Sequence, residues 1–170
     1  MMQRAYDAII TSLSVPPGAT REQRMQILVD LAWEHLSPQD VSWIGFYLDR
    51  PGEPDESRLV LGPSRNSPAC SPIGLHGVCG QALLQKETRI VPDVAELGPD
   101  YIACDPRDRA EIVVPLIDPS GTCWAVLDLD SHSAGAFSER DDEGLRGVLK
   151  KAGLIDRDLE EPRESDEVTK

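Results

Sequence analysis

The hydrophobic residues of this chain recur at two different spacings, and helical spacing marks four segments. In the clearest of them, apolar side chains stand at positions 25, 28, 31 and 32. A repeat of three to four residues predicts a helix with one face against a core. Pro16-Pro17-Gly18 separates this helix from the one before it, and Pro38 ends it. The predicted helices span residues 3–13, 20–36, 78–86 and 138–154.

Other segments alternate along the chain in the way that strands do. In residues 42–48, Trp43 and Tyr47 fall on one face, and Ile44, Phe46 and Leu48 fall on the other. Such runs of aromatic and β-branched residues between turn-forming segments predict strands. The predicted strands span residues 42–48, 58–61, 89–91, 111–117 and 123–129.

The order of these elements indicates the fold class. Two helices precede two strands, and a loop, a helix, a strand, a second loop, two strands and a last helix follow. Hairpin-linked strands with helices beside them predict an α+β domain around a mostly antiparallel sheet. The length of 170 residues suits one domain with a sizeable core.

Charge and composition exclude several functions. The net charge is −13, with 17 basic against 30 acidic residues. So acidic a surface repels nucleic acid and anionic lipid. No apolar run approaches the roughly 20 residues that span a bilayer. The N-terminus leads into an amphipathic segment and lacks a signal-peptide pattern, so a cytoplasmic protein is expected.

Part of the acidic excess lies in the last residues. Residues 156–170 hold seven acids and three bases and almost no apolar side chains. This composition predicts a disordered tail. The expected organisation is therefore one folded domain over residues 1–155, followed by an acidic tail over residues 156–170.

Three of the four cysteines lie where thiol chemistry is feasible. Cys70 lies in a long loop (62–77), and Cys104 lies in a second loop (92–109). Cys79 falls in the first turn of a helix, where the macrodipole favours a thiolate, although a buried structural thiol fits that position equally well. Cys123 lies in an apolar run and is interpreted as core packing.

The cysteine spacings favour neither a structural nor a metal role. A chain without a secretory signal seldom carries a structural disulfide framework. The intervals from Cys70 to Cys79 and from Cys79 to Cys104 do not match paired zinc knuckles. We therefore expect no metal and no cofactor.

Three acidic residues are further candidates for a functional site. Glu111 begins an apolar strand, and Asp128 and Asp130 alternate with leucines, so both carboxylates face the same side of one strand. A solvated sheet face is one interpretation. The other is a ligand site, because paired acids repel unless a cationic or protonated group lies between them. The ammonium group of an amino acid would serve.

Six segments of the chain, in order, resemble the free methionine-(R)-sulfoxide reductases, which are stand-alone GAF domains. The resemblance runs from about residue 20 to residue 154. Its segments are Trp43-Ile44-Gly45-Phe46-Tyr47-Leu48, Leu59-Val60-Leu61-Gly62-Pro63, Gly77-Val78-Cys79-Gly80, Ile102-Ala103-Cys104-Asp105, Glu111-Ile112-Val113-Val114-Pro115-Leu116 and Val126-Leu127-Asp128-Leu129-Asp130-Ser131.

The resemblance implies a GAF-type domain with a six-stranded antiparallel sheet flanked by helices. It also implies thiol-dependent reduction of free methionine-(R)-sulfoxide. By motif, Cys104 corresponds to the nucleophile, Cys70 to the resolving thiol and Cys79 to the third family cysteine. The pocket positions are matched by Trp43, Tyr47, Glu111, Asp128 and Asp130.

The chain departs from the family between Cys70 and Cys79, where the loop is about one residue shorter and the G-x-G-V-C pattern is missing. Either cysteine therefore remains a candidate for the resolving thiol. A sulfenic acid at Cys104 would condense with it into a disulfide. Exchange with a small dithiol protein such as thioredoxin would then restore both thiols.

A second hypothesis is a non-catalytic GAF module that binds a small ligand for regulation. The sequence shows no second domain that would serve as its output, which favours the enzyme. A homodimer is compatible with either hypothesis.

Overall fold

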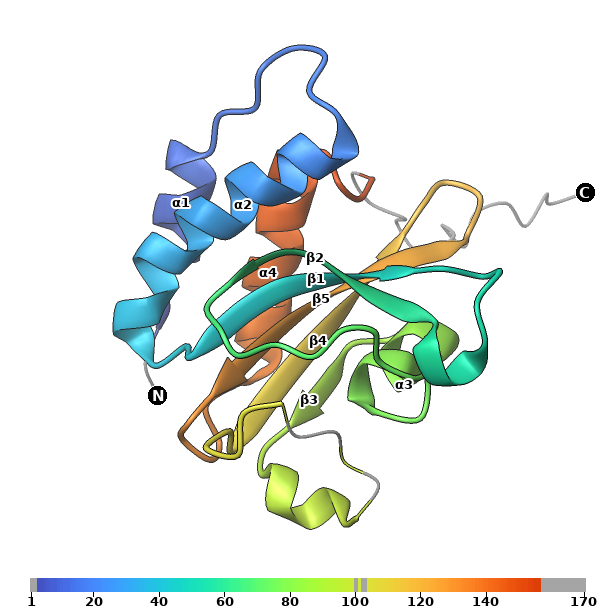
Figure 1. The fold of residues 1–170 in the computed structure, drawn as a ribbon. Coiled ribbons are helices and arrows are strands. Elements are labelled where there is room, and N and C mark those ends of the chain that lie inside the picture. The colour runs from blue at the N-terminus through green and yellow to red at the C-terminus, as the bar shows by residue number, and fades with distance from the viewer. Residues whose placement is uncertain (1–2, 100, 102–103, 157–170) are drawn as a thin grey trace, which may run out of the picture.

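A five-stranded antiparallel sheet forms the centre of the protein, whose computed structural model describes residues 3–99, 101 and 104–156 (Figure 1). The order of strands across the sheet is β2-β1-β5-β4-β3. The strands are β1 (Trp43–Asp49), β2 (Leu59–Arg65), β3 (Arg89–Val91), β4 (Ala110–Ile117) and β5 (Cys123–Ser131). The helices are α1 (Tyr6–Ser12), α2 (Arg21–Leu36), α3 (Val78–Gln85) and α4 (Glu139–Ala152). The described residues also form short 3-10 helices, η1 (Ser37–Gln39), η2 (Asp55–Ser57) and η3 (Val94–Leu97).

The sheet separates two layers. Helices α1, α2 and α4 cover one face, and α3 lies on the other face together with the loops that follow β2 and β3 (Figure 1). Alternation along each strand explains this division. In β1, Ile44 and Phe46 are buried against the three-helix layer, whereas Trp43 and Tyr47 join a second cluster with Cys79 of α3. The two faces predicted for β1 are confirmed.

The helix boundaries follow capping chemistry that is visible in the sequence. The Ser138 N–H donates to the Asp141 carboxylate (2.8 Å), and the same carboxylate accepts from Arg4 (2.7 Å), so α4 begins where it was predicted. Thr20 and Gln23 form a capping box at the start of α2. Helix α1 is shorter than predicted.

Two expectations about the sheet were wrong. The described residues form five strands rather than six. After β2, the chain makes an isolated bridge from Ile73 to Leu59, and Pro72 immediately before Ile73 has no N–H with which to extend a ladder. Conversely, β2 continues to Arg65, four residues into the predicted loop. Pro63 is tolerated there because β2 lies at the sheet edge.

Within the described part of the chain, no helix has both the length and the apolar character needed to cross a membrane. The predicted tail lies outside the described residues from position 157 onward.

Candidate active site

Three carboxyl groups gather on the α3 side of the sheet, at its centre. The register of β4 and β5 places Glu111 directly opposite Asp130, and Asp128 lies two residues before Asp130 on β5. On the neighbouring β1, Trp43 pairs with Asp130 and Gly45 pairs with Asp128. Like charges directly opposite one another destabilise a sheet. The arrangement therefore points to a function that needs closely spaced acids, and it disfavours the solvated-face interpretation.

Burial controls the ionisation of these acids. Glu111 and Asp128 are only 5% and 6% exposed, and Asp130 is partly buried. Burial raises the pKa of Glu111 well above its usual range, and the nearby charge of Asp130 adds to the effect. Burial likewise raises the pKa of Asp128, with Glu111 as the next cause. The carboxyl groups are thereby biased toward their protonated forms, which suits them to hold and donate protons.

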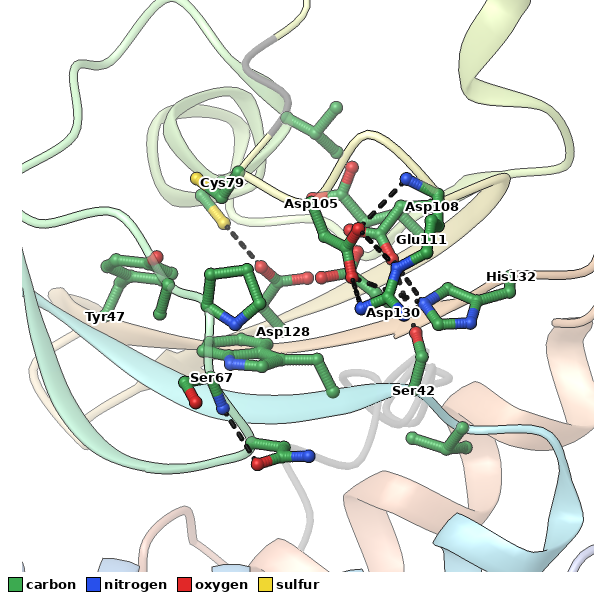
Figure 2. A pocket seen from close by; sticks show the side chains of 18 of the residues that line it. Ser42, Tyr47, Ser67, Cys79, Asp105, Asp108, Glu111, Asp128, Asp130 and His132 are labelled. Carbon is green, nitrogen blue, oxygen red and sulfur yellow. Dashed lines mark hydrogen bonds and ion pairs between the residues drawn. The ribbon is translucent and has the colours of Figure 1, made fainter.

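Cys79 belongs to the same cluster. Its thiol donates a hydrogen bond to Asp128 Oδ2, with Sγ and Oδ2 3.5 Å apart (Figure 2). Burial raises the pKa of the Cys79 thiol, and the charges of Asp128 and Glu111 raise it further. Of the two interpretations left open for Cys79, the structure therefore favours the buried thiol over the thiolate, because desolvation and adjacent acids outweigh the macrodipole of a helix of eight residues.

A disulfide joins the two cysteine loops. It links Cys70 to Cys104 across 34 residues of sequence, with the two Cα atoms 5.6 Å apart. Cys79 and Cys123 are free and buried. Cys123 donates to the Ala125 carbonyl within β5, so its predicted core role is confirmed. The cysteine that pairs with Cys104 is thus Cys70.

Trp43 and Tyr47 of β1 form an aromatic wall beside the acids of the neighbouring strands. The ring centroids of Trp43 and Tyr47 are 5.9 Å apart. The Tyr47 hydroxyl donates to the Cys70 carbonyl (2.8 Å), which fixes the Cys70 loop over the sheet. The Trp43 indole lies across Gly45, where an added methyl group would collide with the ring and with Ser64. Glycine at position 45 is thus required for the indole to lie flat.

Replacing Gly45 with alanine is expected to destabilise the protein by about 1–3 kcal/mol, because an overfilled site forces its neighbours from their preferred positions. Urea unfolding measures the loss. Gly52→Ala is the matched control, since an added Cβ there meets no atom within 4 Å. Equal stabilities for the two variants would show that the Trp43 ring is free to move aside.

The side chains of this region line a cavity of about 330 Å³. Seven of the eight predicted site residues line it: Trp43, Tyr47, Cys79, Cys104, Glu111, Asp128 and Asp130. The eighth, Cys70, does not line the cavity but is joined to Cys104, which does. Figure 2 shows Cys79 and Tyr47 on one side of Asp128, with a second polar group on the other side.

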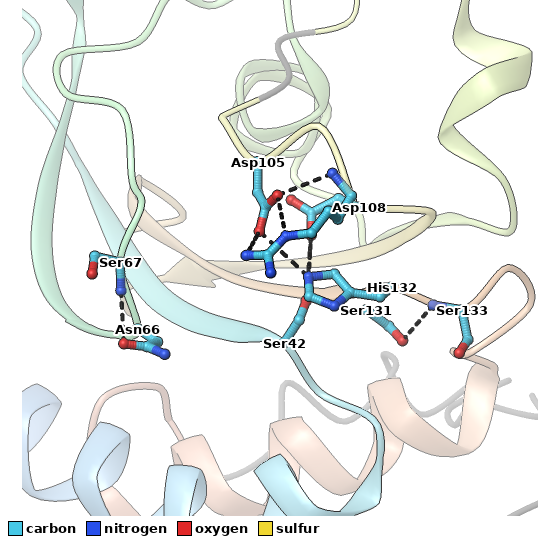
Figure 3. Close-up of polar contacts among 9 residues, drawn as sticks. Ser42, Asn66, Ser67, Asp105, Asp108, Ser131, His132 and Ser133 are labelled. Atoms are coloured by element: carbon cyan, nitrogen blue, oxygen red, sulfur yellow. Dashed lines mark hydrogen bonds and ion pairs between the residues drawn. The ribbon is translucent and has the colours of Figure 1, made fainter.

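That second polar group was missed by the sequence analysis. Asp105, Asp108 and His132 gather at the cavity (Figure 3), where His132 Nε2 lies 3.4 Å from Asp105 and 3.7 Å from Asp108. Arg107 holds Asp105 through two hydrogen bonds of 3.0 and 2.8 Å. Asp108 accepts from Ser42 (3.3 Å). Little in the local sequence marks this group, because an Asp-rich loop and a histidine just after a strand are common at surfaces.

The two aspartates of this group differ in ionisation. Hydrogen bonds from Arg107 hold the pKa of Asp105 well below its usual range. Burial raises the pKa of Asp108 to about 6, and the adjacent Asp105 contributes. The Asp108 charge in turn is among the causes that raise the pKa values of Glu111, Asp128 and Asp130. Asp108 is therefore electrically coupled to the acids of the sheet.

Three buried polar atoms at the cavity lack a hydrogen-bond partner among the described residues: Trp43 Nε1, Glu111 Oε2 and Asp128 Oδ1. Leaving such atoms unpaired costs free energy, so they are available to a ligand. In the described part of the chain, two sets of side chains also bring donor atoms within 4.8 Å of one another, as metal ligands do. One is Cys79, Glu111 and Asp128, and the other is Asp105, Asp108 and His132.

Comparison with known families agrees with the architecture. The model of the family described as "GAF domain" matches residues 18–155, which is most of the sequence. The chain belongs to the GAF domain family. Its α+β sheet, with helices α1, α2 and α4 on one face and the cavity on the other, is thus a GAF fold, as the sequence predicted.

Among GAF domains, this chain is similar to named reductases. It is 42% identical over 112 residues to the free methionine-R-sulfoxide reductase of Saccharomyces cerevisiae, covering 65% of this chain and 61% of the yeast protein. It is 38% identical over 121 residues to that of Escherichia coli K12, covering 70% of this chain and 67% of the relative. The matched region therefore spans about three fifths to two thirds of these relatives.

A solved structure extends the likeness. The free methionine-R-sulfoxide reductase of Neisseria meningitidis, in complex with its substrate, superposes with a TM-score of 0.69 at 32% identity. The superposition covers 86% of this chain and 81% of that one. The family resemblance recognised in the sequence is confirmed by these three comparisons.

Proposed function

We propose that this GAF domain reduces free methionine-(R)-sulfoxide to methionine with its own thiols. The observation that carries the proposal is the meeting, in one cavity, of the disulfide partner Cys104 and the buried acids of β4 and β5. Reduction of a sulfoxide needs a nucleophilic sulfur and a source of protons, and the cavity offers both. The choice of substrate rests on the similarity to free methionine-R-sulfoxide reductases.

Cys104 is the proposed nucleophile. It lines the cavity, whereas Cys70 does not. Its thiolate attacks the sulfoxide sulfur, and one proton is taken up as oxygen is transferred. The sulfoxide is reduced to methionine, and Cys104 is oxidised to a sulfenic acid. Glu111 and Asp128, which burial biases toward protonated forms, are suited to provide that proton.

Cys70 is the proposed resolving thiol. It attacks the Cys104 sulfenic acid, forming the disulfide and releasing the oxygen as water. A dithiol protein such as thioredoxin would then reduce the disulfide and become oxidised itself. Cys79 is not suited to this step, because it is buried and its thiol is hydrogen-bonded to Asp128. We assign Cys79 instead to the acid cluster.

The substrate is expected to lie between the aromatic wall and the acids. Its methyl-sulfur group would contact Trp43 and Tyr47, because sulfur packs favourably against ring edges. Its ammonium group would be bound by the carboxyl groups of β4 and β5 and would relieve their mutual repulsion. The cytoplasmic location and the possible homodimer remain predictions from the sequence.

The direct test offers the R and S epimers of free methionine sulfoxide separately and measures the methionine formed, with dithiothreitol as a chemical reductant. We expect methionine from the R epimer and little from the S epimer. A parallel assay with thioredoxin, thioredoxin reductase and NADPH tests the recycling step. A lack of turnover of the R epimer with either reductant would favour a GAF module that only binds its ligand.

Removing the Asp108 charge is expected to shift the pH dependence of this reduction. Asp108 is ionised above pH about 6, and its charge raises the pKa of Glu111, Asp128 and Asp130. In Asp108→Asn, these acids should lose their protons at lower pH, so the alkaline limb of kcat/KM should move to lower pH. Glu56→Gln, at an exposed position away from the cavity, should leave the profile unchanged. A shift toward higher pH, or none, would contradict the coupling.

A further inference from the structure

Cys79, Glu111 and Asp128 together have the composition of a metal site. One is a soft sulfur donor and two are carboxylates, and each offers an atom within 4.8 Å of the others. All three side chains are at least nine-tenths buried and come from separate elements, α3, β4 and β5. We propose that they form a binding site for one thiophilic divalent cation such as Zn²⁺.

The spacing of the donor atoms suits such an ion. With metal–sulfur and metal–oxygen bonds of about 2.3 and 2.1 Å, tetrahedral ligands lie about 3.6 Å apart for S···O and about 3.4 Å apart for O···O. Cys79 Sγ and Asp128 Oδ2 lie 3.5 Å apart. The hydrogen-bonded pair therefore has the length of one tetrahedral S···O edge, and Glu111 offers an oxygen within 4.8 Å of both atoms.

Two unpartnered atoms support the same site. Glu111 Oε2 and Asp128 Oδ1 are buried and lack hydrogen-bond partners among the described residues. A cation would pair both oxygens and would displace the protons that burial favours on these carboxyl groups. Asp130, on the same face of β5, adds a third carboxyl group beside it. The site can therefore supply the negative charge that a dication needs once protons are displaced.

The donor set also selects among metals. Mg²⁺ and Ca²⁺ prefer oxygen ligands, whereas a thiolate favours Zn²⁺ and Cd²⁺. The neighbouring group of Asp105, Asp108 and His132 is a weaker candidate, because Arg107 already occupies both oxygens of Asp105. Three protein ligands leave a fourth position of the metal open toward the cavity.

The metal and the substrate should exclude one another, a consequence that rests on the proposed function. The ion would use the carboxyl groups to which the substrate ammonium group is assigned. An excess of free methionine-(R)-sulfoxide should therefore weaken metal binding in a competitive manner.

The experiment uses the full chain in its disulfide form, in which Cys70 and Cys104 are already joined and cannot ligate a metal. Cd²⁺ serves as the probe, since a cadmium–thiolate bond produces a charge-transfer absorption band in the ultraviolet. Excess Mg²⁺ saturates weak carboxylate sites on a protein of net charge −13. We expect a band that saturates at one Cd²⁺ per chain, and Zn²⁺ should displace it.

Matched variants locate the ion. Cys79→Ser should lose the band, whereas Cys123→Ser, which removes the other buried free thiol, should keep it. Asp128→Asn should weaken Cd²⁺ binding at least about tenfold, as loss of a metal's supporting groups commonly does. Asp105→Asn, in the neighbouring acidic group, should leave the affinity unchanged. Thermal melting of each variant verifies its fold.

The site would be refuted by an absent band, by a band that survives Cys79→Ser, or by equal affinities of the wild type and Asp128→Asn. If Cys79→Ser does not melt cooperatively, the comparison of Asp128→Asn with Asp105→Asn decides. Metal binding that is insensitive to the substrate would contradict the ammonium subsite of the proposed function and leave the metal site intact.

Discussion

Cys104→Ser is expected to abolish reduction of free methionine-(R)-sulfoxide. Cys104 lines the cavity and forms a disulfide with Cys70, so it is placed to attack the substrate. Cys79 is buried and its thiol has a raised pKa, and Cys123 is buried within β5, so neither replaces it. A serine hydroxyl does not replace the thiolate, because its oxygen is far less nucleophilic toward sulfur. Methionine formation over many turnovers, with dithiothreitol present, measures the loss.

Cys70→Ser is the matched control for this prediction. It should keep a single turnover, releasing one methionine per chain, because the attack at Cys104 does not involve Cys70. Recycling by thioredoxin should stop, since no disulfide forms. Normal recycling of Cys70→Ser with thioredoxin would show that Cys79 is the resolving thiol. The shortened loop between Cys70 and Cys79 would then explain the change of resolving residue.

The second large effect concerns the amino group of the substrate. N-acetylation converts the ammonium group into a neutral amide, which loses its charged contact with the buried acids. Removing one partner of a buried charge pair costs about 3–5 kcal/mol, which corresponds to a factor of about 150 to several thousand in affinity. We therefore expect N-acetylated and protein-bound methionine sulfoxide to be reduced at least about 100-fold less efficiently than the free amino acid.

Asp130→Asn tests the same contact between the ammonium group and the acids by changing the protein instead of the substrate. It should lower kcat/KM for the free substrate and leave the unfolding transition close to that of the wild type, because Asp130 is only partly buried. It should scarcely change the small activity on the N-acetylated substrate. Comparable rates of the wild type on free and acetylated substrates would overturn the assignment of the acids to the ammonium group.

Local patterns in the sequence were sufficient to predict most of the fold. Alternation along β1 correctly divided Trp43 and Tyr47 from Ile44 and Phe46, and the Ser138 cap placed the start of α4. Both signals depend on neighbouring residues. The sixth strand was expected from the family resemblance alone, and Pro72 next to the isolated bridge of Ile73 explains why no sixth strand forms there among the described residues.

The site was predicted less completely, because its geometry depends on contacts distant in sequence. The spacing of Asp128 and Asp130 predicted that they share a face, but their register with Glu111 depends on how β4 and β5 pair. The group of Asp108 and His132 depends on where a loop folds back over the sheet, which no local pattern shows. The choice between a thiolate and a buried thiol at Cys79 stayed open for the same reason, since its acidic neighbours come from the strands of the sheet.

A single-turnover experiment tests the central claim most directly. The fully reduced protein is mixed with an excess of free methionine-(R)-sulfoxide in the absence of any reductant, and methionine and disulfides are quantified together. We predict one methionine per chain and, by peptide mapping, one new disulfide between Cys70 and Cys104. Loss of both thiols without methionine formation, or methionine formation that leaves the Cys104 thiol intact, would contradict the account.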